Sequence, residues 1–247
     1  MKISIGVMTC NKYKARYDAI KNTWGKDFDR IFYFGGDQSN PDEIIPLNYP
    51  ETYGSILYIQ HDIYKYLYEK HDDSDWYCVI NDDGMLMKEN LEHILKKYDP
   101  STDLYLGTSN YKSDILPFRN YIKDPNSEFA NVYYASGGPG FFFSNSLMKK
   151  IYPRVDEMLD IWVKDCKKHF NLKEQFIDAG LAYQLYRMFG IKTIDINTDD
   201  YRLYTQNPSH YLKLEGAVCK KPMGFHYVDP AMMYKLYERF PELGCPR

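Results

Sequence analysis

Residues 76–84 read Trp-Tyr-Cys-Val-Ile-Asn-Asp-Asp-Gly, a short apolar run that passes directly into an amide and two carboxylates. The apolar part predicts a buried strand, because a few apolar residues bounded by turn residues suit the interior of a parallel sheet. The polar part would then lie at the carboxyl end of that strand, where open α/β sheets bind their ligands. This stretch therefore predicts both a fold class and the position of a functional site.

Segments on both sides of this stretch alternate between strand-like and helix-like patterns. Apolar runs of strand length separate longer segments in which apolar residues recur at helical spacing. We expect strands over residues 3–9, 30–35, 75–80 and 104–107, and helices over residues 11–24, 53–70 and 87–98. This alternation predicts an α/β fold with a mostly parallel central sheet flanked by helices.

The later part of the chain is less regular. Residues 111–135 are typical of loops and short strands, and a glycine-rich turn then leads into an apolar run at residues 141–143. We expect helices from Asn145 behind a Ser144 cap, over residues 173–189 before Gly190, and from Pro230 onward, with strands over residues 191–196 and 223–228. The whole chain, residues 1–247, is expected to form one domain.

Charge and composition exclude several classes of protein. The chain has 31 Lys and Arg against 34 Asp and Glu, and its net charge of −3 offers no basic surface for nucleic acid. No apolar run approaches the roughly 20 residues that span a bilayer. The segment behind Met1 is too short and too strand-like for a signal peptide. The five cysteines form no C-x-x-C pair, which excludes a zinc ribbon or a thioredoxin-type site.

The adjacent carboxylates of Asp82 and Asp83 suggest a metal site. Two acids at the end of an apolar strand repel each other and lose hydration, and a divalent cation with a preference for oxygen ligands offsets that cost. The alternative is a simple polar turn, in which Asn, Asp and Gly are common for conformational reasons. The sequence contains no H-E-x-x-H, P-loop, G-x-G-x-x-G or G-x-S-x-G motif that would indicate another chemistry.

Several blocks of the sequence resemble one known family. Residues 76–91, with Asn81-Asp82-Asp83, resemble the acidic metal-binding segment of the fringe and β-1,3-galactosyltransferase superfamily, with the greatest likeness to core 1 β-1,3-galactosyltransferases. Further blocks follow in the family's order at residues 16–25, 97–100, 136–141 and 225–234. The turn at residues 136–141 is similar to the family's Ser-Gly-Gly-Ala-Gly-aromatic motif. Together the blocks extend over most of the chain.

The resemblance implies a GT-A fold, which is a Rossmann-like fold that binds nucleotide sugars. It implies a nucleotide-sugar half at about residues 1–108 and an acceptor half at residues 109–247. The activity it implies is inverting transfer of a hexose from a UDP-sugar to a sugar hydroxyl of a glycan acceptor. Mn²⁺, or Mg²⁺, would be held on the donor diphosphate by Asp83 and His226, with Asp82 beside the metal, the ribose or the donor sugar. It implies further donor contacts from Thr9, Asn11, Arg16, Gly137 and Gly138.

Two departures from the family pattern bear on activity. The first acid of the family's triplet is Asn81 here, which keeps a hydrogen-bonding group and removes one charge. Single-step inversion also needs a carboxylate to accept the acceptor's proton. The family has an acidic pair where this chain has Gln175-Phe176, before Gly180. Glu174 and Asp178 flank that position on one helix face, and we favour Asp178, which is nearer to the glycine, although a solvated helix acid is an equal alternative.

The tyrosine content is unusually high, at 25 of 247 residues. We expect most of these tyrosines to pack in the core, including Tyr13, Tyr17, Tyr64 and Tyr68 on helix faces. The loops at residues 110–134 and 199–211 are expected to shape the acceptor site. Their tyrosines are the candidates to line it, namely Tyr133, Tyr134, Tyr201, Tyr204 and Tyr211.

Other functions and locations remain open on the sequence. A non-catalytic binding or chaperone-type relative is favoured by Asn81 and by the missing acidic pair, and opposed by Asp82, Asp83 and His226. A sugar-binding lectin is a weaker alternative that depends on aromatic content alone. We expect a cytoplasmic protein as the chain stands, or a Golgi-type lumenal domain if it is excised from a longer one. The sequence does not fix the oligomeric state.

Overall fold

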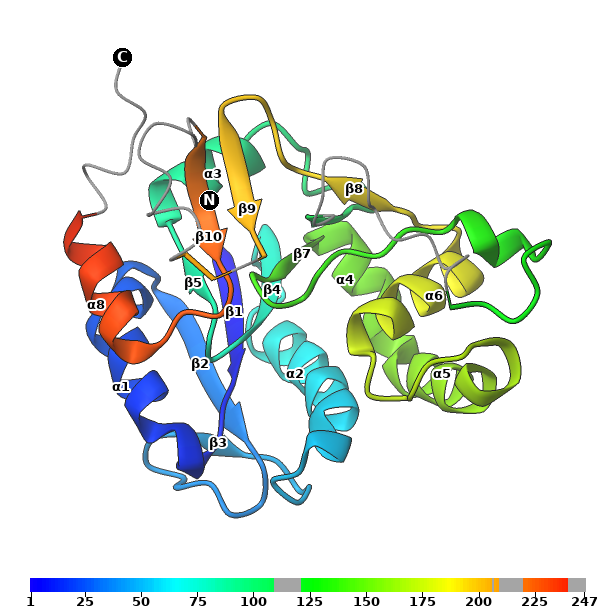
Figure 1. Cartoon of the computed structure of the whole chain (residues 1–247), viewed down its shortest axis with the longest axis horizontal. Coiled ribbons are helices and arrows are strands. Elements are labelled where there is room, and N and C mark those ends of the chain that lie inside the picture. Colours follow the sequence, from blue (N-terminus) through cyan, green and yellow to red (C-terminus); the bar gives the residue numbers. More distant parts are fainter. Residues whose placement is uncertain (109–120, 206, 209–219, 240–247) are drawn as a thin grey trace.

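A computed structural model of the chain describes residues 1–108, 121–205, 207–208 and 220–239 (Figure 1). Within these residues the central sheet has seven strands in the order β3-β2-β1-β4-β7-β6-β8. Their bounds are β1 Ile3–Met8, β2 Arg30–Gly35, β3 Ile45–Pro46, β4 Trp76–Asn81, β6 Tyr105–Gly107, β7 Phe141–Ser144 and β8 Thr193–Asp195. Only β7 runs antiparallel to its neighbours β4 and β6. The predicted mostly parallel α/β sheet is confirmed.

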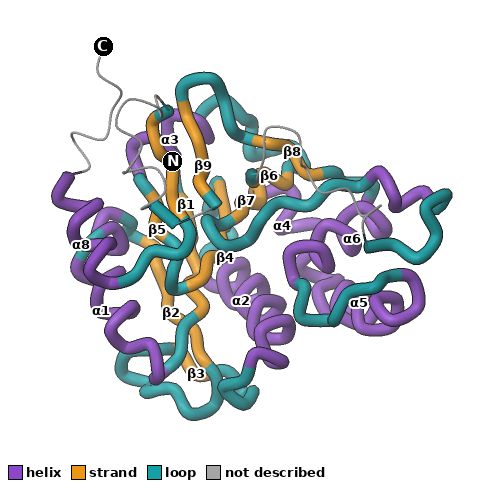
Figure 2. The backbone as a smooth tube through the Cα atoms, viewed as in Figure 1, coloured by secondary structure: helices purple, strands orange, loops and turns teal. Residues whose placement is uncertain are grey.

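Helices cover both faces of this sheet (Figure 2). Their bounds are α1 Lys14–Asn22, α2 Ile56–Lys70, α3 Lys88–Leu95, α4 Asn145–Ile151, α5 Val155–His169, α6 Ile177–Phe189 and α8 Pro230–Arg239. Apolar side chains of α2, α4, α5 and α6 form one core cluster with one face of the sheet, and those of α1, α3 and α8 form another with the opposite face. Strand β4 supplies both clusters, because Tyr77 and Val79 point to one side and Cys78 and Ile80 to the other.

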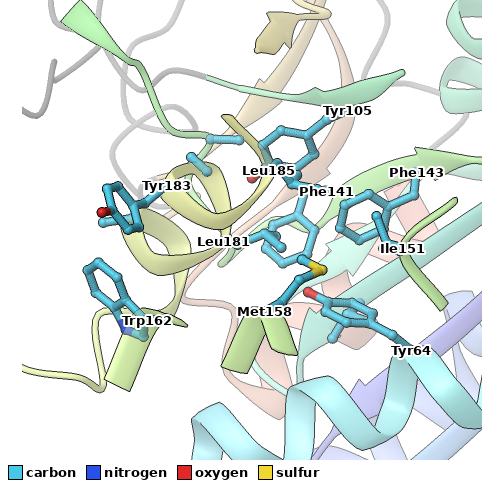
Figure 3. Packing of buried hydrophobic residues seen from close by; sticks show 14 of the residues in the cluster. Tyr64, Tyr105, Phe141, Phe143, Ile151, Met158, Trp162, Leu181, Tyr183 and Leu185 are labelled. Atoms are coloured by element: carbon cyan, nitrogen blue, oxygen red, sulfur yellow. The ribbon is translucent and has the colours of Figure 1, made fainter. Parts of the chain in front are cut away.

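Aromatic residues fill the larger cluster (Figure 3). Tyr64 of α2 lies edge-on to Phe143 of β7, with ring centroids 5.2 Å apart, and Tyr105 of β6 stacks on the same Phe143 at 5.4 Å. Tyr64 and Tyr105 are both fully buried. Burial of such large apolar areas confirms that much of the tyrosine excess serves packing.

Tyr13 does not follow the prediction for helix tyrosines. Tyr17 is buried on α1, but Tyr13 is 39% exposed, so the expected core position is wrong for Tyr13. The cause is local, because residues 11–13 form a separate 3-10 turn before α1 begins at Lys14. Its ring is thereby turned away from the buried face of the helix and toward the functional cleft described below.

A second, smaller sheet joins distant parts of the chain. It contains β5 Met85–Leu86, β9 Tyr201–Tyr204 and β10 Lys221–Phe225, in the order β5-β10-β9. Strand β10 pairs parallel to β9 and antiparallel to β5, which follows β4 directly in sequence. The predicted strand at residues 223–228 therefore exists but ends at Phe225. The turn after β10 is fixed by a hydrogen bond of 2.9 Å from the Val228 amide to the Asp83 carbonyl.

The helix boundaries confirm some local signals and correct others. The hydroxyl of Ser144 accepts a hydrogen bond of 3.2 Å from the Leu147 amide, as the predicted cap of α4 requires. Gly190 ends α6 in the left-handed conformation, with φ of +69°. The helix predicted from residue 173 begins only at Ile177, so Asp178 lies in the first turn of α6. Among the described residues, no helix has both the length and the apolar character to cross a membrane.

Candidate active site

A cleft of about 420 Å³ opens beyond the carboxyl ends of β1, β2 and β4. The residues that line it come from three segments and from Gly36, namely residues 8–10, 12, 13 and 16, residues 51–53, 56 and 59, and residues 81–83. This is the edge at which a sheet of this kind binds its ligands, and the volume lies in the range that small-molecule sites occupy. The predicted position of the site at the end of the 76–84 stretch agrees with this geometry.

Asp82 is buried in the lining of the cleft, and each of its carboxylate oxygens accepts a hydrogen bond from the protein. One carboxylate oxygen accepts a hydrogen bond of 2.8 Å from Arg16 Nη1, and the other accepts one of 2.9 Å from the Thr9 hydroxyl. Burial raises the pKa of Asp82, against the opposing effects of Arg16 and Thr9. In this arrangement Asp82 holds Arg16 in place.

Arg16 is the cation that this network presents to the cleft. Its guanidinium lies over the Tyr13 ring, 4.4 Å from the centroid, and Nη1 is 3.9 Å from a carboxylate oxygen of Asp83. The side chain remains 32% exposed and lines the cleft. A guanidinium fixed in this way suits an anionic ligand such as a diphosphate.

Asp83 and His226 meet at the junction of the two sheets. His226 Nε2 lies 3.3 Å from Asp83 Oδ1, but this oxygen is buried and has no partner with hydrogen-bond geometry. Burial pushes the pKa of Asp83 upward, yet His226 and Arg16 outweigh it and the net shift is downward. Within the described residues, no cluster of three or more His, Cys, Asp or Glu side chains has the geometry to hold a metal ion. Asp83 and His226 are therefore a pair of potential ligands that needs others from a bound molecule.

Gly137 and Gly138 contact the site residues themselves. A β-carbon added at Gly138 would overlap the imidazole of His226, and one added at Gly137 would lie 2.5 Å from Asp178 Oδ1. The Gly137 amide also donates a hydrogen bond of 2.9 Å to Asp178 Oδ2. In the structure these glycines pack against Asp178 and His226, and their contact with the donor stays a prediction.

The two candidate bases have different surroundings. Burial raises the pKa of Asp178, while the Gly137 amide and the charge of His226 act in the opposite direction. Nearby, Gly180 of α6 approaches the Trp162 indole so closely that an added β-carbon would lie 2.7 Å from it. Glu174 instead pairs with the exposed Lys167 at 2.8 Å. The structure thus brings Asp178 toward His226 and engages Glu174 elsewhere.

Asn11 lies outside the cleft lining. Its amide nitrogen donates to the Gln38 carbonyl, and its amide oxygen accepts a hydrogen bond of 3.2 Å from the Asn40 amide. Asn11 thus fastens the loop at residues 38–40, and its contact with the donor stays a prediction. Asn81 does line the cleft, at the end of β4.

The predicted acceptor tyrosines are only partly in suitable places. Tyr204 is buried, with its ring stacked on Phe225 at 5.3 Å, so the prediction is wrong for Tyr204. Tyr201 stacks on His93 at 4.8 Å, and Tyr133 is 42% exposed. Tyr134 is half-buried, and Tyr211 lies outside the described residues.

Sequence reasoning misses two exposed tyrosines near the site. Tyr53, which is 71% exposed, lines the cleft from the 3-10 turn before α2. Tyr227, which is 56% exposed, directly follows His226. Tyr227 could have been predicted from the sequence, because it directly follows His226, a candidate metal-binding residue. Nothing in the sequence distinguishes Tyr53 from an ordinary helix residue.

The chain is similar in sequence to proteins of known family. A family model described as Fringe-like matches residues 1–198. The chain is 26% identical to human chondroitin sulfate synthase 3, over 94% of this chain and 26% of that protein. It is 26% identical to the β-1,3-N-acetylglucosaminyltransferase lunatic fringe of Xenopus laevis, over 79% of this chain and 52% of that protein. A mouse β-1,3-glucosyltransferase is 24% identical, over 94% of this chain and 42% of that protein.

Solved structures share the fold at low sequence identity. The galactosyltransferase LgtC, in complex with donor and acceptor sugar analogues, aligns with a TM-score of 0.55 at 12% identity, over 97% of this chain and 94% of that one. A glycosyltransferase involved in glycosylation of the major capsid of PBCV-1 aligns with a TM-score of 0.51 at 12% identity, over 96% of this chain and 99% of that one. The predicted GT-A fold is therefore confirmed. The narrower likeness to core 1 enzymes stays a prediction. The chain, which spans between a quarter and about half of the length of the curated relatives above, belongs to the Fringe-like family.

Proposed function

We propose that this protein is an inverting glycosyltransferase that moves a hexose from a UDP-sugar to a hydroxyl of a glycan acceptor, with Mn²⁺ or Mg²⁺ as cofactor. The observation that carries the proposal is the convergence of the Asp83 carboxylate, the His226 imidazole and the Arg16 guanidinium at one edge of the sheet. This edge faces a cleft large enough for part of a nucleotide. The relatives named above, whose names are those of glycosyltransferases and a synthase, support the same reaction class.

The Asp83–His226 pair fits a bound divalent cation. The Oδ1 atom of Asp83 is buried without a hydrogen-bond partner, and the imidazole nitrogen beside it is a second potential ligand. A carboxylate with an imidazole is an acceptable set for Mn²⁺, and the remaining ligands would be diphosphate and water oxygens. When bound, the cation would neutralise charge that develops on the leaving UDP.

Three residues of this chain would supply the other parts of the mechanism. Arg16 would place a second positive charge beside the diphosphate, and it is held by Asp82, whose other oxygen accepts from Thr9. Asp178 would accept the proton of the attacking acceptor hydroxyl. In the same step the hydroxyl oxygen would bond to the anomeric carbon, and the bond between that carbon and the UDP oxygen would break. The Gly137 amide would orient the Asp178 carboxylate for that transfer. Attack and departure on opposite faces of the sugar would give inversion.

The alternative is a non-catalytic binding protein, favoured by Asn81 and by Gln175-Phe176 in place of family acids. Calorimetric titration with UDP, in Mn²⁺ and in EDTA, separates the two functions when it is combined with a hydrolysis screen of UDP-sugars. The proposal predicts metal-dependent UDP binding and slow hydrolysis of at least one UDP-sugar. Asp83→Ala should abolish both, and Asp160→Ala, at an exposed acid of α5, should change neither. Equal UDP binding in EDTA would contradict the metal site, and UDP binding without hydrolysis or transfer would favour the binding protein.

A further inference from the structure

Tyr227 has a backbone conformation that tyrosine rarely adopts. Its φ is +56°, and no other non-glycine residue in the described part of the chain has a positive φ. A bulky side chain in the left-handed region is strained, and such strain is concentrated at ligand-binding and catalytic positions. The residue nevertheless exposes 56% of its surface, so burial of its ring does not explain the strained conformation.

Contacts on both sides of Tyr227 impose this conformation. His226 is packed against Gly138, and the Val228 amide is bonded to the Asp83 carbonyl at 2.9 Å. The Tyr227 ring stacks on the His226 imidazole, with centroids 3.7 Å apart and an angle of 24° between the planes. One ring face is therefore covered by the imidazole, and the exposure of the side chain comes from the other face and the ring edge.

The Tyr227 ring lies where the acceptor sugar would bind, near the proposed base and outside the nucleotide cleft. Tyr227 directly follows His226, whose Nε2 lies 3.3 Å from Asp83 Oδ1. The His226 imidazole packs against Gly138, and the neighbouring Gly137 amide bonds Asp178 at 2.9 Å, so the turn that carries Tyr227 lies beside both the proposed metal ligand and the proposed base. The cleft that fits the nucleotide lies on the side of β1 and Arg16, and Tyr227 is not among the residues that line it.

We propose that the open face of Tyr227 is the platform on which the acceptor sugar stacks, so that the pyranose bearing the attacking hydroxyl is held beside Asp178. This assignment rests on the proposed glycosyltransferase function. A pyranose has an apolar C–H face and a rim of hydroxyls, and a phenol ring offers an apolar face with a polar tip to match. The strain at Tyr227 is then the result of directing an aromatic ring toward the acceptor from a turn that must also place His226.

Direct sugar binding tests the assignment without requiring turnover. Saturation-transfer NMR with a panel of p-nitrophenyl hexosides would measure Kd for the wild type and for Tyr227→Ala, Tyr227→Phe and Tyr227→Gly, in EDTA and in UDP with Mn²⁺. We expect a roughly tenfold weaker Kd for the Ala and Gly variants and a Kd within about twofold of wild type for Tyr227→Phe. Tyr234→Ala is the matched control, because Tyr234 is 40% exposed on α8 and its hydroxyl accepts a hydrogen bond of 3.4 Å from Asn22 of α1.

Thermal stability supplies a second readout that a merely structural tyrosine would not give. Glycine adopts positive φ without strain, so Tyr227→Gly should raise Tm while it weakens hexoside binding. The assignment is wrong if Tyr227→Ala binds every hexoside as tightly as wild type does, or if no hexoside binds wild type in either buffer. A different result would show that the glycosyltransferase proposal alone is wrong. The protein would then neither hydrolyse UDP-sugars nor transfer sugar, but its hexoside binding would still depend on Tyr227.

Discussion

The glycines at 137 and 138 show how a missing β-carbon lets distant side chains meet at the candidate site. His226 can reach Asp83 only because Gly138 leaves room for its imidazole, and the Gly137 amide reaches Asp178 in the same turn. The serine-glycine-glycine pattern is therefore a matter of close packing between backbone and side chain. Sequence alone shows that glycines are present, but it cannot show which side chain from a distant segment occupies the space.

Gly138→Ala should disrupt the site more than the fold. The added methyl group overlaps His226, so the imidazole must move away from Asp83. We expect Mn²⁺-dependent UDP binding, measured by calorimetry, to weaken at least tenfold.

Gly190→Ala is the matched control for this variant. Nothing lies within 4 Å of a β-carbon at Gly190, but its φ of +69° strains alanine, so Tm should fall while UDP binding stays at the wild-type value. Equal UDP binding by the two variants, each folded, would show that Gly138 does not position His226.

Asp178 and Glu174 are separated by their environments although they are close in sequence. Asp178→Asn should lower kcat for transfer by about 10²-fold to 10⁴-fold, the usual range for loss of a general base, and leave UDP binding unchanged. Glu174→Gln removes only an ion pair with an exposed lysine and should have a small effect. If Glu174→Gln instead caused the larger loss, Asp178 would not be the base.

The pH dependence of transfer tests the same assignment. A base acts in its ionised form, and burial raises the pKa of Asp178. Activity should therefore be lost as the pH falls through an apparent pKa above that of an ordinary aspartate, which is about 3.9. A rate profile with its acid limb at or below that value would contradict the assignment.

At the scale of secondary-structure elements, prediction from sequence succeeds where the signal is local. Strand β2 matches residues 30–35 as predicted, and α8 begins at Pro230 as expected. The sequence shows β7 only as an apolar run after a glycine-rich turn, and it predicts a loop where β9 lies. Both depend on partners far away in the sequence, since β9 pairs with β10 and β7 lies between β4 and β6. Such pairing leaves little trace in the local pattern of residues.

Helices α2, α5 and α6 are joined by a buried polar link. His61 Nδ1 lies 2.7 Å from the Leu57 carbonyl, so it carries the proton, and Nε2 accepts from the Gln184 amide at 3.2 Å. The same amide donates to the Met158 carbonyl at 2.7 Å. The arrangement requires a neutral imidazole, and desolvation accordingly lowers the pKa of His61.

This link predicts a pH dependence of stability. Because the folded-state pKa of His61 is lowered, its contribution is fully present above the unfolded pKa of about 6.5 and is lost as the pH falls below it. The free energy of unfolding should decrease by up to about 1.4 kcal/mol per pH unit from this residue. Urea unfolding between pH 5 and 8 measures it, and His61→Gln should show a shallower slope than wild type or the control His169→Gln. Equal slopes in the three proteins would refute this role.

At the scale of the whole molecule, the site lies where the two sheets meet. Asp83 follows β4 of the central sheet, whereas His226 follows β10 of the small sheet. The acidic stretch and the histidine were both predictable as candidates, but their meeting depends on the pairing of β10 with β5. A ligand held by both residues must therefore stabilise the contact between the sheets as well as fill the cleft.

Thermal unfolding should report this coupling. A ligand that binds only the folded state stabilises it by RT ln(1 + [L]/Kd), which is about 2.7 kcal/mol at 100 times Kd. For a chain of this length each kcal/mol raises Tm by roughly 2–4 °C, so UDP with Mn²⁺ should raise Tm by about 5–10 °C. UDP in EDTA should give a much smaller shift, and Asp83→Ala should remove the combined shift, while Asp160→Ala keeps it. A full shift in EDTA would mean that UDP binds through the cleft alone and that no metal joins the two sheets.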